Sequence, residues 1–138
     1  MFSRLSGKNK KPGVDLASAE RVFESVHITA DRVGTALCVS IADEHVTERE
    51  AGIIYDESVA QLDDRCTGIV LDFSNVEMLA SAGIGTLVRL HKRMKERKGQ
   101  VALCGLSSEL KELLKLTRMD KLLTVCDDKP SAVAAVVS

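Results

Sequence analysis

One short segment of this 138-residue chain combines a single hydroxyl with several small residues. The segment begins a predicted helix and reads Ala80-Ser81-Ala82-Gly83-Ile84-Gly85. Each glycine so early in a helix costs roughly 1 kcal/mol against alanine, which indicates that something approaches the backbone closely there. The Ser81 hydroxyl would lie beside free N–H groups at the positive end of the helix dipole, where a phosphoryl group is tolerated. From the residues alone, the simpler role of a helix N-cap is favoured for Ser81.

Motifs for other chemistry are weak. The sequence has no phosphate-binding loop and no G-x-S-x-G elbow, and no third glycine follows Gly83-Ile84-Gly85 at Val88. The acidic pairs Asp63-Asp64 and Asp127-Asp128 are adjacent in predicted turns, which is typical of solvated positions. A hydrolase or small-ligand binder using Ser81 remains an alternative, with His45 as its one candidate base. His91 is expected to line the edge of a helix stripe rather than act in catalysis.

The cysteines Cys38, Cys66, Cys104 and Cys126 are widely spaced and include no C-x-x-C pair. We expect reduced, mostly buried thiols that pack as small hydrophobic side chains, and slow reaction of those in strand-like contexts. Zinc-ligand spacing with His27, His45 or His91 is absent, so neither a metal nor another cofactor is expected. These features favour a cytoplasmic location.

The charge balance gives no sign of a nucleic-acid or membrane partner, because the chain has 19 Lys or Arg residues and 20 Asp or Glu residues, a net charge of −1. The chain has no Trp, one Tyr and three Phe, which disfavours a platform for stacking bases. No apolar run is long enough to span a bilayer, and residues 1–12 lack the apolar core of a leader peptide. The basic stretch Arg89–Lys98 is interpreted as a solvated helix face, with a surface for an acidic partner as the alternative.

Hydrophobic periodicity predicts one α/β domain over residues 19–138, preceded by a flexible segment at 1–18. We expect antiparallel strands at 20–27 and 35–41, joined by a turn at 31–34, and further strands at 68–73, 101–104 and 122–126. Helices are expected to start near Thr47, Ser81, Ser107 and Pro130. The order ββαβαβαβα predicts a mixed sheet with a parallel centre, helices packed on it, and 69–73 as a central strand.

The same periodicity predicts which helix faces are buried. The stripe expected in the first helix is Ala51, Tyr55, Val59 and Leu62. The stripe expected in the second is Ile84, Leu87, Val88, His91 and Met94, with Gly99 ending the helix.

From about residue 35 to 136, the chain resembles the STAS domain, the family of bacterial anti-sigma factor antagonists. The resemblance rests on the order of several pieces, none of which is specific alone. They are the strand Ile69–Phe73, the Ser-x-Gly helix start, Leu90–Arg93, Gly99–Leu106 and Leu113–Leu123.

In this family the loop reads Asp-Ser-[Ser/Thr]-Gly, and a partner anti-sigma kinase phosphorylates the serine after the aspartate. The resemblance therefore implies that Ser81 is the phosphorylation site. The sequence departs from the pattern at three positions: Ala80 replaces the acid, Ala82 replaces the second hydroxyl residue, and Arg118 stands where a helix-ending glycine is usual. Loss of the acid would weaken kinase recognition, or remove the switch and leave a constitutive binder.

The resemblance implies a protein–protein interaction module with no catalytic activity. Its partner would be an anti-sigma factor with the histidine-kinase-like ATPase fold, which is also the serine kinase, and the module would be a monomer or weak dimer. The expected contact surface comprises Asp43, Glu44, His45, Met78, Leu79, Ala80, Ser81, Ala82, Gly83 and Ile84. A scaffold subunit of a signalling assembly, or a domain regulating a membrane transporter in trans, is the alternative.

Overall fold

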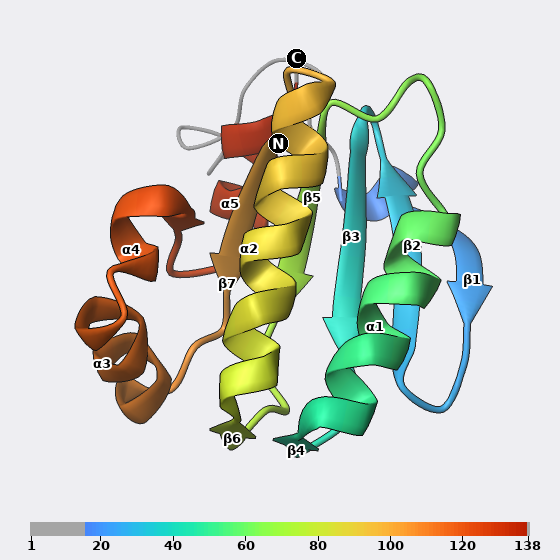
Figure 1. Ribbon diagram of the computed structural model, residues 1–138. Helices are drawn as coiled ribbons and strands as arrows, with labels where there is room; N and C mark the ends of the chain where they lie inside the picture. Colours follow the sequence, from blue (N-terminus) through green and yellow to red (C-terminus); the bar gives the residue numbers. More distant parts are fainter. Residues whose placement is uncertain (1–15, 138) are drawn as a thin grey trace.

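The computed structural model describes residues 16–137, which form a mixed sheet covered by helices (Figure 1). Six strands make the main sheet, in the order β1-β2-β3-β5-β7-β8. The first three are joined by antiparallel pairing, and β3, β5, β7 and β8 are parallel. The strands are β1 (Glu20–Glu24), β2 (Ile28–Val33), β3 (Ala36–Ile41), β5 (Gly68–Asp72), β7 (Gln100–Cys104) and β8 (Thr124–Val125).

Helices cover both faces of the sheet. On one face α1 (Glu48–Ala60) and α2 (Ser81–Glu96) lie side by side, and α5 (Lys129–Val136) packs on the other (Figure 1). Alternate residues of β5 divide between these layers: Ile69 and Leu71 face α1 and α2, whereas Val70 faces α5. The helices α3 (Ser108–Leu116) and α4 (Met119–Leu122) connect β7 to β8. The α/β class, the parallel centre and the central position of 69–73 are therefore confirmed.

The N-terminal strands differ from the prediction. Three strands are present instead of two, and residues 28–33 form β2 where a turn at 31–34 was expected. The chain reverses in the two residues between Val33 and Ala36, where Gly34 takes a φ of 59°. Such a tight reversal leaves residues 31–33 free to pair with β3. Of the predicted flexible segment, residues 1–15 lie outside the described residues, and Leu16–Ser18 form a 3-10 turn.

Helix starts agree with the prediction, but the buried stripes are shifted. In α1 the buried residues are Ala51, Ile54 and Ser58. In α2 they are Gly83, Thr86, Leu87, Leu90 and Met94, while Ile84, Val88 and His91 are only half-buried. The two helices pack on each other as well as on the sheet: Thr86 Oγ1 donates to the Ala51 carbonyl at 3.2 Å. Because each of these helices packs against both the sheet and the other helix, its buried face is not the single hydrophobic stripe that periodicity predicts.

The C-terminal region contains an unpredicted helical turn. The expected strand at 122–126 is reduced to Thr124–Val125, because α4 occupies the residues up to Leu122. Arg118, between α3 and α4, has φ 63° and ψ 19°, the left-handed conformation for which glycine is the usual residue. Lys98 takes a similar conformation after α2, so the chain turns at Lys98 rather than at the predicted Gly99.

We expect Arg118→Gly to raise the free energy of unfolding by about 0.5–1 kcal/mol, because glycine adopts this conformation without the clash between Cβ and the following carbonyl. Glu112→Gly, in the right-handed interior of α3, should instead lower it by about 1 kcal/mol. Urea denaturation measures both. Arg118→Gly of equal or lower stability would contradict the strain assigned to Arg118.

The cysteines are mostly buried, as predicted for reduced thiols: Cys38, Cys66 and Cys104 are buried, and Cys126, which follows β8, is half-buried. Burial raises the pKa of the Cys38 thiol to about 11 and that of Cys104 to about 12. Burial also raises the pKa of Cys126. The thiolate is the species that reacts with thiol reagents. At neutral pH these thiols are therefore protected in two ways: burial restricts the access of a reagent, and the raised pKa keeps them protonated.

In the native protein at pH 8, Cys38 and Cys104 should react with Ellman's reagent only as fast as the fold opens, with Cys126 reacting first.

The raised pKa values of Cys38 and Cys104 also predict how stability depends on pH. The contribution of these two thiols to the free energy of unfolding is complete below about pH 9, the ordinary thiol pKa, and is lost as pH rises toward 11–12. Labelling rates and urea melts at increasing pH test both statements. Cys126→Ser should remove the fastest phase, and rapid labelling of Cys38 or Cys104 would show the prediction to be wrong.

Candidate partner-binding site

A small parallel sheet brings together two segments that are far apart in the sequence. It pairs β4 (His45–Val46) with β6 (Met78–Leu79), with His45 opposite Met78. The Glu44 carbonyl accepts hydrogen bonds from the N–H groups of Glu77 at 2.7 Å and Met78 at 3.1 Å. The predicted flanking residues 43–45 therefore do lie beside the loop that precedes α2.

The first turn of α2 places Ser81 on the surface. Ala80, with φ −77° and ψ 171°, is the N-cap, and Ser81 is the first helical residue. The prediction that Ser81 itself caps the helix is wrong, because the extended backbone ends at Ala80 and no side chain caps this helix. The Ala80 carbonyl accepts from the N–H groups of Gly83 and Ile84. Among the described residues, the Ser81 hydroxyl and the N–H groups of Ser81 and Ala82 have no protein partner.

A close contact fixes β6 against α2. A Cβ added to Gly83 would lie 2.2 Å from Leu79 Cδ1 and 2.8 Å from Leu79 Cγ, well inside contact distance. The close approach predicted from the early glycines therefore occurs at Gly83, and the approaching group is a side chain of the same protein. At Gly85 a Cβ would meet nothing within 4 Å.

The ten predicted contact residues differ in exposure. Glu44, His45, Met78 and Ser81 are exposed, whereas Asp43, Ala80, Ala82 and Ile84 are half-buried. Leu79 and Gly83 are buried, so these two residues position the loop and are not accessible to a partner. The accessible surface is smaller than predicted from the sequence and centres on Met78 and Ser81.

One positioning residue was missed. His27 Nδ1 lies 2.9 Å from Asp43 Oδ2, and the His27 carbonyl accepts the N–H of Ala42 at 2.8 Å. These contacts hold the start of the 42–45 loop against the turn between β1 and β2. His27 and Asp43 are 16 residues apart, and no local pattern in the sequence links them.

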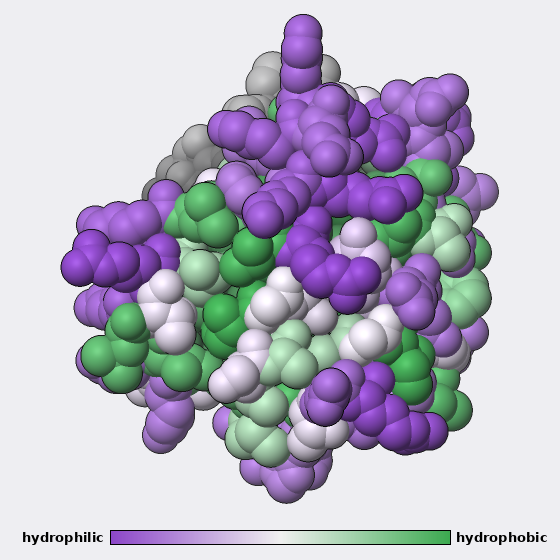
Figure 2. All heavy atoms as spheres, in the orientation of Figure 1, coloured by the Kyte–Doolittle hydropathy of each residue, from purple (hydrophilic) through white to green (hydrophobic). Residues whose placement is uncertain are grey.

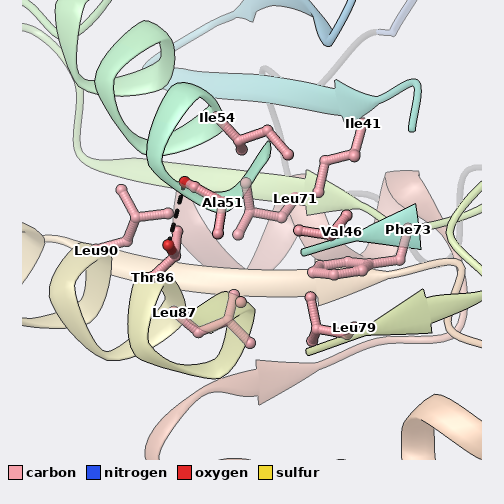
Figure 3. Close-up of a pocket in the computed structure, with 11 residues that line it drawn as sticks. Ile41, Val46, Ala51, Ile54, Leu71, Phe73, Leu79, Thr86, Leu87 and Leu90 are labelled. Carbon is pink, nitrogen blue, oxygen red and sulfur yellow. Dashed lines mark hydrogen bonds between the residues drawn. The ribbon is translucent and has the colours of Figure 1, made fainter. Parts of the chain in front are cut away.

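The space beneath this surface is too small for a substrate. Apolar residues from both helices and the sheet, with Thr86, surround a hollow of about 10 Å³ (Figure 3). That volume holds at most about one water. Within residues 16–137 no histidine or carboxylate hydrogen-bonds the Ser81 hydroxyl, and no His, Cys, Asp or Glu side chains group as metal ligands.

None of the described helices is both long and apolar enough to cross a bilayer. A family model described as the STAS domain matches residues 13–132. The chain belongs to the STAS domain family. The match confirms the resemblance that the order of the short motifs indicates.

The chain is also similar to individual proteins that are named anti-sigma factor antagonists. An anti-sigma F factor antagonist from Paenibacillus polymyxa is 23% identical over 90 residues, covering 65% of this chain and 75% of that protein. The solved structure of an anti-sigma-factor antagonist (STAS) domain protein from Planctomyces limnophilus is 26% identical, with a TM-score of 0.70 and coverage of 81% of this chain and 98% of the other. An anti-sigma factor antagonist from Mycobacterium paratuberculosis is 19% identical, with a TM-score of 0.68 over 92% and 97% of the two chains. This STAS domain is therefore similar to anti-sigma factor antagonists at low identity.

The contact between Leu79 and Gly83 gives a matched pair of substitutions. Gly83→Ala should lower the free energy of unfolding by about 1–3 kcal/mol, because the new methyl group overlaps Leu79. Gly85→Ala, two residues further along the same helix, should raise it by up to about 1 kcal/mol. Thermal or urea denaturation distinguishes the two.

A double-mutant cycle isolates the contact. In a Leu79→Ala background, Gly83→Ala should cost at least about 1 kcal/mol less than in the wild type. Equal costs in both backgrounds would show that the contact does not constrain the loop.

Proposed function

We propose that this STAS domain is a non-catalytic anti-sigma factor antagonist whose Ser81 is a phosphorylation site. The partner is an anti-sigma factor with the histidine-kinase-like ATPase fold, which binds the exposed surface around Met78 and Ser81. The observation that carries the proposal is the placement of Ser81: an exposed hydroxyl at the first residue of a 16-residue helix, beside the β4–β6 sheet.

The fold would tolerate a phosphate on Ser81. The N–H groups of Ser81 and Ala82 have no acceptor among the described residues, and they lie at the positive end of the α2 dipole. No acidic residue is present in the first turn of α2, so an added phosphate meets no carboxylate from that turn. Phosphorylation would therefore change the surface charge by about −1.5 to −2 without disturbing the fold.

A partner would respond differently. Met78, at 40% exposure, and the half-buried Ile84 give the surface an apolar rim beside Ser81. Burying a charged group in such a contact without a dedicated cation costs several kcal/mol. Each 1.4 kcal/mol lowers affinity about tenfold, so one phosphate is enough to separate the two proteins.

We expect Ser81→Asp to weaken binding of the cognate anti-sigma factor at least about tenfold, with little change in melting temperature. Ser81→Ala should bind like the wild type and resist phosphorylation. Calorimetric titration against the kinase-type anti-sigma factors of the same organism measures affinity, and mass spectrometry after incubation with ATP locates any phosphate.

Ser108→Asp is the matched control, because Ser108 is also exposed and is also the first residue of a helix, α3. It adds the same charge at an equivalent helix position and should leave the affinity unchanged. Equal affinities of Ser81→Asp and Ser81→Ala would refute the switch. Ala80→Asp restores the acid of the family motif and should increase the rate of phosphorylation; no phosphate on Ser81 in either form would indicate a constitutive binder.

A further inference from the structure

Charge is strongly segregated along this nearly neutral chain. Residues 20–77 contain 13 Asp or Glu against 4 Arg, a net charge of −9. Residues 88–122 contain 10 Lys or Arg against 4 Asp or Glu, a net charge of +6. The net charge of −1 for the whole chain conceals this division, which sequence composition alone did not reveal. The basic part comprises most of α2 together with β7, α3 and α4.

The basic part also contains a groove. A hollow of about 510 Å³, here called the α2–α4 groove, lies between the C-terminal half of α2 and the end of α4. It is lined by Val88, His91, Lys92, Lys95, Glu96 and Leu122. Figure 2 shows hydrophobic surface between the positions of α2 and α4, with hydrophilic residues above it. Val88 and Leu122 are thus the apolar positions in a groove bordered by lysines.

One exposed apolar side chain belongs to the groove itself. Five large hydrophobic residues are exposed in the described part of the chain, and three of them lie between positions 116 and 125. They are Leu116 at 75%, Leu122 at 40% and Val125 at 36% exposure. Of these three, Leu122 lines the α2–α4 groove, whereas Val125 lines a separate hollow beside Lys111 and Lys115.

The groove lysines are available to a partner. In the described residues, neither Lys92 nor Lys95 forms an ion pair. Arg89, by contrast, lies 3.7 Å from the centre of the Tyr55 ring on α1 and is directed away from the groove. Arg89 is therefore engaged within the fold, whereas Lys92 and Lys95 can pair with another molecule.

We propose that the α2–α4 groove is a docking site for an acidic amphipathic helix of a protein partner. An apolar side chain of that helix would seat against Val88 and Leu122, while carboxylates beside it would pair with Lys92 and Lys95. This is the helix-in-groove mode of recognition, in which apolar contacts anchor the segment and charges select it. The groove residues on α2 lie 7–15 positions after Ser81, or about 10–22 Å along the helix at 1.5 Å per residue. The site is thus separate from the Ser81 surface, and the inference goes beyond the proposed function.

Other occupants fit less well. The segment 88–122 contains no Phe, Tyr or Trp, the side chains that stack on bases or anchor in membrane interfaces. A second copy of this chain would have to offer its acidic part, yet Val26 is the one large hydrophobic exposed in the described residues 20–77. Its neighbours Ser25 and His27 are hydrogen-bonded to Glu57 and Asp43, so these two carboxylates are already engaged within the fold.

The test uses the full chain, labelled with ¹⁵N, and a synthetic probe. The probe is a capped helical peptide of about 18 residues, with leucines along one face and glutamates on both sides of them. Amide shifts should change at residues 88–96 and 119–123. Lys92→Gln combined with Lys95→Gln should weaken binding about threefold to tenfold, and raised salt should do the same. A peptide with lysines in place of the glutamates should not bind.

Arg49→Glu is the matched charge control. It also changes the net charge by two units, and it alters an exposed residue on α1 whose side chain is 76% accessible. The affinity of this variant for the probe should equal that of the wild type. An equal loss in both variants would mean that the charge of the whole molecule, rather than the groove, attracts the peptide, and would overturn the proposal.

Three further outcomes would also overturn it. One is the absence of shifts, or shifts confined to residues 78–84. The second is binding of anionic phosphatidylglycerol vesicles or duplex DNA through the groove lysines in preference to the peptide. The third is self-association in sedimentation experiments that is abolished by Lys92→Gln with Lys95→Gln, since a second copy would then occupy the groove.

Discussion

The structure depends on burying the central parallel strands on both faces at once. Ile69, Val70 and Leu71 in β5 are each at most 1% exposed, so neither face of the sheet can be left to solvent. Both faces therefore need helices: the crossovers after β3 and β5 supply α1 and α2 for one face, and α5, which follows β8, covers the other. Because parallel strands end at the same edge, the connections after β3 and β5 meet there, where β4, β6 and the start of α2 lie together (Figure 1). The position of Ser81 follows from this arrangement of the core.

Local contacts at that edge determine how the Ser81 surface is presented. The Asp72 carboxylate accepts from the Ser74 N–H at 2.9 Å and from its hydroxyl at 2.5 Å, which turns the chain away from the sheet after β5. The other oxygen of Asp72 lies 3.5 Å from Lys129 Nζ and so links this turn to α5. Leu79 then packs on Gly83 and ties β6 to the first turn of α2. An exposed serine is thus held by a loop that is anchored at both ends, which is what a preorganised contact surface requires.

The sequence predicts long elements well and short ones poorly. The continuous apolar run at 69–73 and the polar starts of α1, α3 and α5 carry their own periodicity and caps, and these elements were predicted correctly. The strands β4 and β6 have two residues each, too few to show an alternation of apolar and polar residues. They form only because segments 33 residues apart in the chain meet at the sheet edge. The same limit applies to the site. Resemblance located Ser81, but the burial of Leu79 and the pairing of His27 with Asp43 depend on tertiary contacts.

The two surfaces on α2 lie toward opposite ends of one rigid element, and their electrostatics follow the helix dipole. The positive end, at Ser81, favours an added anion, whereas the negative end favours the cations of the C-terminal half. Ser81 and Lys92 are 11 residues apart, or about 16 Å along the axis, which is about twice the Debye length of roughly 8 Å at physiological salt. A phosphate on Ser81 would therefore act on a partner bound at that end with little effect on the groove lysines. If both proposals hold, charge segregation along α2 would keep the switchable contact at Ser81 electrostatically independent of the contact at the groove.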